Sequence, residues 1–177
     1  ERTSPWEFFN YWINLSDEEA IQHAKWFLPL SRDATQAILD AATESDDPRS
    51  LQKSLARQMT SLIYGDEAMN RCRRVSEALF NNDISELDDD DMTTLDGHIP
   101  TAKLSRNCLS VLADMLVEAK VATSKRDART LLEQGAISIN GRLVRSVEDF
   151  TAANLHLDKF ALIRRGKKNW HLAVLEG

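Results

Sequence analysis

Three cations at helical spacing follow Ser124, a residue type that often begins helices. Lys125, Arg126 and Arg129 lie three or four positions apart, so a helix would place them on one side of its first turns. The positive end of the helix dipole disfavours cations there, whereas an anion would be attracted by both the side chains and the unpaired N–H groups. The spacing is compatible with a phosphate-binding surface, but taken alone it is better explained by ordinary solvated surface residues.

A second group of cations surrounds a glycine near the end of the sequence. Arg164, Arg165, Lys167 and Lys168 flank Gly166, and the neighbouring sequence contains no acid. Like charges at this spacing repel one another unless an anion is bound, and phosphate is the obvious anion. The alternative is a hairpin tip that only improves solubility.

The overall charge by itself argues against a nucleic-acid partner, because the 177 residues carry a formal net charge of -6. The distribution argues the other way. Residues 121–177 contain ten Lys or Arg against six Asp or Glu, so the acidic excess lies in the rest of the chain. A phosphate responds to charges within about a Debye length, ~8–10 Å, so a basic end on an acidic chain is compatible with RNA binding.

The first ninety residues are expected to form helices only. Capping or first-turn residues repeatedly precede apolar residues spaced by three or four, and no alternating pattern typical of strands occurs. Trp6, Phe9 and Trp12 should face a core. The expected helix starts are Ser4, Ser16, Ser31, Pro48 and Asp66.

Residues 81–107 have a different composition. Four consecutive aspartates, Asp88 to Asp91, lack the alternating ligands and central glycine of a calcium loop, so we expect no metal site. They are better explained as the acidic first turn of a short helix, with Leu87, Met92 and Leu95 buried. Residues 96–107 are the best candidate for a linker.

The last seventy residues mix helices and strands. Helices are expected near 108–120 and from Ser124 to Gly135, and strands at 136–139, 142–144, 160–165 and 169–174. Asn140-Gly141 is a strong two-residue hairpin turn. Trp170 could stack on a base, but a buried strand tryptophan is favoured. The fold class is therefore an all-α helical domain followed by a small α+β domain.

The segment 124–141 closely resembles the S4 RNA-binding domain. The shared pattern is a serine, basic residues, an Ala-Arg pair, a Leu pair, Gln-Gly, a short strand and Asn-Gly. The resemblance implies an S4-like fold for 108–177. It places the following residues on an RNA-binding surface: Lys125, Arg126, Arg129, Asn140, Gly141, Arg142, Arg164, Arg165, Lys167 and Lys168.

The flanking segments resemble bacterial-type tyrosyl-tRNA synthetases. Residues 3–8 with 12–14 are similar to the start of their anticodon-binding domain, 76–80 to its end, and 164–170 to their terminal basic hairpin. The resemblance implies a helical anticodon-binding domain at 1–95, a linker at 96–107 and the S4-like domain at 108–177. Asp17 matches an aspartate that reads anticodon bases in this family; the alternative is a carboxylate that only stabilises the start of a helix.

The same resemblance implies what the parent protein does. Its activity would be ATP-dependent ligation of tyrosine to its tRNA by a homodimer, in the cytoplasm or, for an organellar enzyme, in the mitochondrial matrix. The HIGH and KMSKS signatures that bind ATP and tyrosine are missing, and the chain starts at Glu1 without Met. We therefore expect a monomeric tRNA-binding fragment without catalytic residues, cofactor or membrane contact, with Cys72 and Cys108 as free thiols.

Three other interpretations stay open at this point. The chain could contain an S4 module from an rRNA-modifying enzyme or ribosomal protein, although the aromatic first helix and the terminal hairpin speak against it. It could be a protein–protein adaptor that uses its acidic helical half. A fungal mitochondrial synthetase that also binds group I introns is not excluded by any residue.

Overall fold

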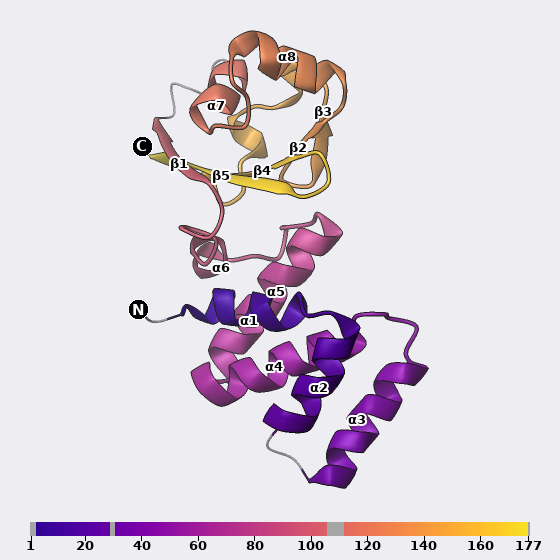
Figure 1. The fold of residues 1–177 in the computed structure, drawn as a ribbon. Coiled ribbons are helices and arrows are strands. Elements are labelled where there is room, and N and C mark those ends of the chain that lie inside the picture. The colour runs from indigo at the N-terminus through magenta and orange to yellow at the C-terminus, as the bar shows by residue number, and fades with distance from the viewer. Residues whose placement is uncertain (1–2, 29–30, 106–111, 177) are drawn as a thin grey trace. The chain divides into compact units, whose positions relative to one another are not determined.

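The computed structural model describes residues 3–28, 31–105 and 112–176. The chain forms two compact units, Glu1–Arg74 (unit 1) and Val75–Gly177 (unit 2). Helix α5 (Asp66–Asn81) contributes residues to both units. The expected all-α part followed by an α+β part is confirmed, and each unit is described by itself below (Figure 1).

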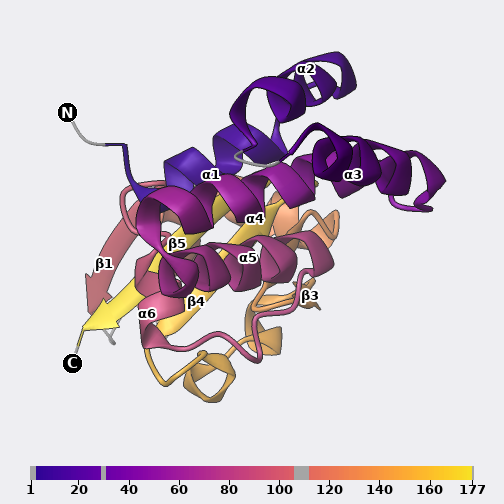
Figure 2. The same ribbon diagram turned by 90° about the horizontal axis from the view of Figure 1, so that it is seen from below.

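Unit 1 is a set of short helices, and serine caps begin three of them. The hydroxyl oxygens of Ser4, Ser16 and Ser31 accept the N–H three residues later, which satisfies donors that a helix leaves unpaired. Figure 2 shows α4 lying along α1, with α2 and α3 beside them. The bounds are α1 Pro5–Ile13, α2 Asp17–Phe27, α3 Arg32–Glu44 and α4 Ser50–Tyr64.

The core of unit 1 is built by the apolar stripes of these helices. Trp6, Phe9 and Trp12 of α1 are buried, as their helical spacing predicts. Leu55 of α4 is fully buried, whereas Leu62, which continues the same spacing, is 56% exposed. The apolar stripe of α4 is therefore covered as far as Met59 and exposed beyond it.

Unit 2 contains one five-stranded sheet with the order β1-β5-β4-β2-β3. Strand β1 pairs in parallel with β5, and the other pairs are antiparallel. The turn between β2 and β3 is formed by Asn140 and Gly141, which both have positive φ, as the sequence predicts. The strand bounds are β1 Thr101–Ser105, β2 Ile137–Ile139, β3 Arg142–Val144, β4 Phe160–Arg165 and β5 Asn169–Glu176.

The two faces of this sheet are covered by different elements. Helices α7 (Leu112–Glu118) and α8 (Lys125–Glu133) bury one face, where Ile163 and Ala173 join the core. Helix α6 (Asp89–Thr93) lies on the other side of the sheet (Figure 1). There Lys159 pairs with Asp89, and His156 Nε2 lies 2.7 Å from the Leu87 carbonyl oxygen.

The aspartate run 88–91 begins α6, as expected for an acidic first turn. The Asp88 carboxylate accepts the Asp91 N–H at 2.8 Å, and Asp91 is itself fully buried in a capping box. Leu87, Met92 and Leu95 are buried, which confirms the helix interpretation. Among the described residues, no group of three or more His, Cys, Asp or Glu is placed to hold a metal ion.

The division of the chain differs from the one expected at 95 and 107. Ile84 and Leu87 are buried, and the segment that contains them belongs to unit 2, so the boundary falls inside α5. The stretch expected to be a linker contains β1, whose register places Lys103 opposite Val174. This pairing joins segments some seventy residues apart, and for that reason local sequence signals did not reveal it.

Cys72 is buried and is not part of a disulfide, while Cys108 lies outside the described residues. None of the described helices combines the length and the apolar character that a membrane span requires.

Candidate nucleic-acid interface

The start of α8 is fixed by a closed set of hydrogen bonds. The Ser124 hydroxyl oxygen accepts the Asp127 N–H at 3.1 Å. The Asp127 carboxylate in turn accepts the Thr123 N–H at 2.8 Å and the Thr123 hydroxyl at 3.0 Å. These bonds orient the first turn of α8, while its opposite side packs into the core through Ala128, Leu131 and Leu132.

The three cations of α8 lie on its exposed side, as predicted, but they are not equivalent. Lys125 Nζ lies 2.7 Å from an Asp114 carboxylate oxygen, and the Lys125 side chain is 64% exposed. Arg126 and Arg129 are exposed, and within the described parts of the chain neither side chain forms an ion pair. A phosphate would meet these two guanidinium groups without first breaking an intramolecular bond.

Two titratable groups near α8 set the local charge. The Thr123 N–H hydrogen bond holds the pKa of Asp127 below its usual range, and the Arg165 charge lowers it further. Partial burial lowers the pKa of His171, and Arg165 adds to this effect, while a backbone hydrogen bond with Ala119 opposes it. At neutral pH, Asp127 is therefore ionised and His171 is uncharged, so the positive charge here comes from Lys and Arg alone.

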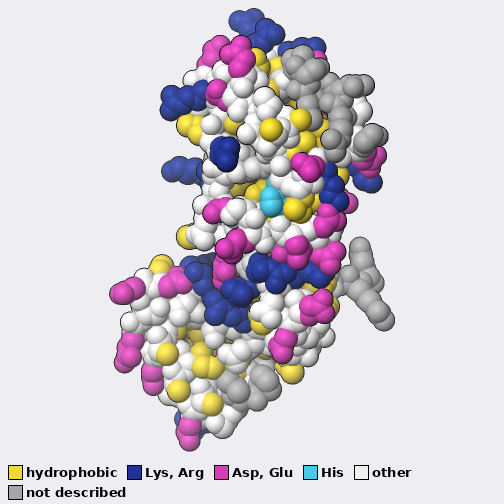
Figure 3. Space-filling model, turned by 180° about the vertical axis from the view of Figure 1, so that it is seen from behind, with side chains coloured by type: hydrophobic (Ala, Val, Ile, Leu, Met, Phe, Trp, Pro, Cys, Tyr) yellow, Lys and Arg dark blue, Asp and Glu magenta, His cyan; other side chains and the backbone are white. Residues whose placement is uncertain are grey.

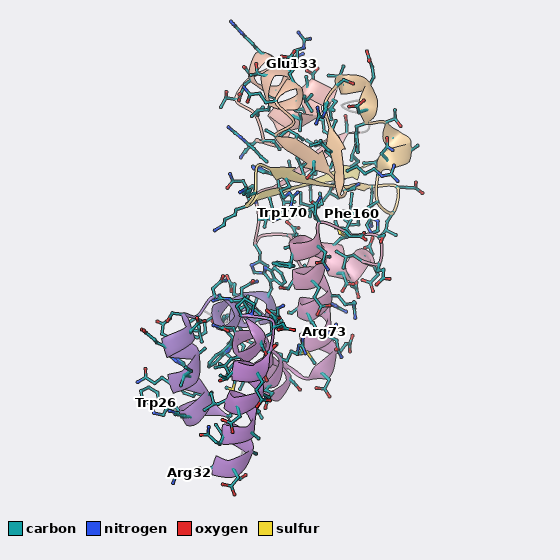
Figure 4. All side chains as sticks on the ribbon, turned by 90° about the vertical axis from the view of Figure 1, so that its right-hand side faces the viewer. Trp26, Arg32, Arg73, Glu133, Phe160 and Trp170 are labelled. Atoms are coloured by element: carbon teal, nitrogen blue, oxygen red, sulfur yellow. The ribbon has the colours of Figure 1, made fainter. Side chains whose placement is uncertain are left out.

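The β4–β5 hairpin separates its two arginines instead of grouping them. Adjacent strand residues point to opposite faces. Arg165 lies on the face covered by α7 and α8, where its Nη1 donates to the Val121 carbonyl at 2.9 Å. Arg164 lies on the other face, with its guanidinium 5.4 Å from the centre of the Trp170 ring. Figure 4 shows Trp170 on the side of the sheet away from α8, which carries Glu133.

The four cations around Gly166 are therefore not equivalent in the structure. Arg165 is held by a carbonyl, and the half-buried Trp170 has one ring face covered by Arg164. Lys167 and Lys168 at the turn are exposed. Figure 3 shows Lys and Arg side chains along the end and edge of unit 2 that carry α8 and this turn.

Asn140 was assigned to the RNA surface from sequence, but its side chain is used inside unit 2. The amide Nδ2 donates to the carbonyls of Asn154 at 2.9 Å and Phe160 at 3.0 Å. The amide oxygen accepts the Leu162 N–H at 2.7 Å. Two of these hydrogen bonds tie the β2–β3 turn to β4 and the third ties it to Asn154, so the amide has little capacity left for RNA.

Gly141 also has an internal role. A Cβ atom at this position would lie 2.4 Å from the backbone oxygen of Asn82, and the φ of +83° is one that side chains disfavour. Asn82 Nδ2 in turn donates to the Gly141 carbonyl at 3.0 Å. Of the three turn residues proposed from sequence, Arg142 is the one with an exposed side chain.

Asp17 is the candidate recognition residue of unit 1, and it begins α2. Its side chain is 78% exposed, yet one carboxylate oxygen is anchored. Gln52 Nε2 donates to Asp17 Oδ1 at 2.7 Å, and Arg49 Nη1 lies 4.0 Å from the same oxygen. The carboxylate therefore has a fixed attachment while most of its surface stays open.

A pocket of about 310 Å³ lies beside this carboxylate. Its wall is mostly apolar, with polar groups from Asp17, Gln52 and Thr43. Gln52 was missed in the sequence, although a signal existed: it lies within the buried stripe of α4, where a polar side chain needs a partner. The apolar lining residues are Ile21, Leu39, Ala42, Pro48 and Leu51.

Comparison with known proteins identifies the region. Residues 91–173 match the family described as the tyrosine–tRNA ligase SYY-like C-terminal domain. Tyrosine–tRNA ligases of Bacillus velezensis and Geobacillus stearothermophilus are 35% and 36% identical over 173 residues, which is 97% of this chain. The enzyme of Staphylococcus haemolyticus is 36% identical over 174 residues. Over nearly its whole length, this chain matches the C-terminal region of bacterial tyrosine–tRNA ligases.

The match to the tyrosine–tRNA ligase C-terminal domain includes both groups of cations, since α8 and the β4–β5 turn lie between 91 and 173. Asp17 lies outside that domain match but inside the helical part that the full-length relatives also cover. The chain spans 41% of the length of these relatives.

Proposed function

We propose that this chain is the tRNA-binding region of a bacterial-type tyrosine–tRNA ligase. The observation that supports it best is the exposed Arg126, Arg129, Lys167 and Lys168 at one end of unit 2, in a chain whose net charge is -6. The whole enzyme would join tyrosine to its tRNA at the expense of ATP. Tyrosine and ATP would be bound by the part of the enzyme outside this chain, which would also form the homodimer.

In unit 2, the proposed contacts are with phosphates. The cations of α8 and of the β4–β5 turn, with Arg142, would grip the stem and long variable arm of tyrosine tRNA, and their field would supply most of the affinity. Arg164 and Arg165 contribute charge from positions fixed by Trp170 and Val121. Asn140 and Gly141 support the hairpin from inside unit 2, so the proposed contacts do not involve them.

In unit 1, the proposed contact is with the anticodon. A carboxylate accepts hydrogen bonds from the N1–H and 2-amino groups of guanine, and the tyrosine anticodon contains one guanine. The exposed Asp17 carboxylate beside an apolar pocket fits an unstacked purine of this kind. The alternative is that Asp17 only stabilises the start of α2.

The test is binding of the 177-residue chain to tyrosine tRNA and to serine tRNA, which also has a long variable arm, across a salt series. The variant Lys167→Ala/Lys168→Ala removes two exposed cations. If both contact phosphates, the log–log salt slope should become shallower by about 1.4–1.8. The control is Lys103→Ala, because Lys103 of β1 pairs with Glu176 at the end of β5 that lies away from this turn, so the slope should stay unchanged.

Each outcome is informative. The proposal is supported if the chain prefers tyrosine tRNA and if the salt slope becomes shallower in the double variant but not in the Lys103→Ala control. Equal binding of both RNAs would assign discrimination to the rest of the enzyme. Absence of binding to either RNA at low salt would refute RNA binding by this region and favour a protein partner.

A further inference from the structure

Gln52 is a buried polar residue that donates a hydrogen bond to a carboxylate at the surface. It is 1% exposed and lies in the apolar stripe of α4, between Leu51 and Leu55. A buried amide without partners destabilises the fold, so its hydrogen bonds show what it is used for. Its Nε2 group donates to Asp17 Oδ1 at 2.7 Å and approaches the Leu15 carbonyl at 3.4 Å.

Arg49 supports the same loop from the start of α4. Its Nη2 donates to the Ile13 carbonyl at 2.6 Å and its Nη1 to the Leu15 carbonyl at 3.1 Å. These carbonyls lie at the end of α1 and in the loop before α2, where helix carbonyls lack internal partners. The backbone leading to Asp17 is thus fixed by Arg49, and the Asp17 side chain is fixed by Gln52.

We infer that Gln52 is a positioning residue that orients the Asp17 carboxylate for base discrimination. An exposed aspartate at a helix start would otherwise sample several rotamers. The bond from Gln52 holds one oxygen, and that oxygen keeps a lone pair because each carboxylate oxygen accepts two hydrogen bonds. Among the described residues no hydrogen bond engages Oδ2, so both oxygens can accept from the two donors of a guanine edge.

This inference rests on the proposed contact between Asp17 and the anticodon, and it makes a separate prediction. Immobilising a side chain at a binding interface costs about 0.5–1.5 kcal/mol. Gln52 would make this ordering occur during folding instead of during RNA binding. Removing the anchor should therefore weaken guanine recognition by about three- to tenfold while leaving phosphate contacts unchanged.

The experiment measures binding of the 177-residue chain to two tyrosine tRNA transcripts, one natural and one with the anticodon guanine replaced by adenine. Adenine lacks both donors, so a two-bond contact should give a ratio of dissociation constants of roughly 5–150. The variants are Asp17→Asn, Gln52→Leu, which keeps size but removes the donor, and Leu55→Ala. The last destabilises the same helix from a fully buried position that does not line the pocket.

The expected result is that Gln52→Leu lowers the ratio three- to tenfold, by weakening binding of the guanine transcript only. Leu55→Ala should lower the melting temperature and leave the ratio unchanged. If Asp17→Asn abolishes discrimination but Gln52→Leu retains it, the positioning role is refuted and the proposed contact survives. If the natural chain does not discriminate, or Asp17→Asn leaves the ratio unaltered, the proposed contact itself is wrong and the inference fails with it. A loss of ratio in Leu55→Ala equal to that in Gln52→Leu would show a merely structural effect.

Discussion

Replacement of Asn140 by alanine should unfold the β2–β3 turn without weakening RNA contacts directly. The substitution removes the three hydrogen bonds to Asn154, Phe160 and Leu162. At about 1 kcal/mol for each bond, the loss is ~3 kcal/mol. Asn140 also has a φ of +49°, which alanine tolerates less well than asparagine, so the total should be about 3–4 kcal/mol.

Amide hydrogen exchange measures this effect where it should occur. The core amides of β4 and β5, for example those of Ile163 and Ala173, should exchange about 100- to 1000-fold faster in Asn140→Ala, because ~1.4 kcal/mol corresponds to a factor of ten. The neighbouring Arg142→Ala provides the control, since that side chain is exposed and should leave exchange unchanged.

Two results with Asn140→Ala would contradict a purely structural role of Asn140. If Asn140→Ala altered exchange less than about fivefold, the three bonds would contribute little to stability. If its tRNA affinity then fell tenfold under conditions where the protein is folded, Asn140 would be an RNA contact, as the sequence first indicated.

Three further predictions concern unit 2. Gly141→Ala should lower the thermal midpoint strongly, because the new methyl group meets the Asn82 carbonyl oxygen at 2.4 Å in a backbone of positive φ; a melt followed by circular dichroism checks this. Asp127 has a lowered pKa in the folded chain, so its bonds stabilise the fold above the unfolded pKa, and this stability is lost as the pH falls below about 4. In Asp127→Asn, the free energy of unfolding measured in urea should therefore depend less on pH in that range. An unchanged pH dependence would contradict this stabilising role of the Asp127 carboxylate. Arg165→Ala should both speed amide exchange in the loop between α7 and α8 and weaken tRNA binding, whereas Lys168→Ala should affect binding only.

The elements of this fold that depend on neighbouring residues were predictable from the sequence. The caps Ser4, Ser16 and Ser124 act on an N–H three residues away, and the Asn140-Gly141 turn needs only two positive φ values. The parallel pairing of β1 with β5 was not predictable in this way, because each strand lacks a local signal for its distant partner.

In the candidate site, too, the features that depend on neighbouring residues were predictable and those that depend on distant residues were not. The exposed cations of α8 were placed correctly by helical spacing alone. The separation of Arg164 from Arg165 could have been inferred from strand alternation, which places adjacent residues on opposite faces. The anchoring of Asp17 by Gln52 could not, since the two residues lie 35 positions apart and meet only after α1, α2 and α4 have packed.

The position of β5 inside the sheet has a consequence for biosynthesis. Strand β5 lies between β1 and β4, so its eight residues supply the ladder partners of both neighbours. During translation, β1 emerges from the ribosome more than sixty residues before β5, the strand with which it pairs. Strands β1 and β4 therefore each keep an unpaired edge until β5 has been made, and such edges can pair with other chains. Unit 1 has all of its own helices by then, so the chain should emerge with its helical part folded first and its sheet closing in one late step.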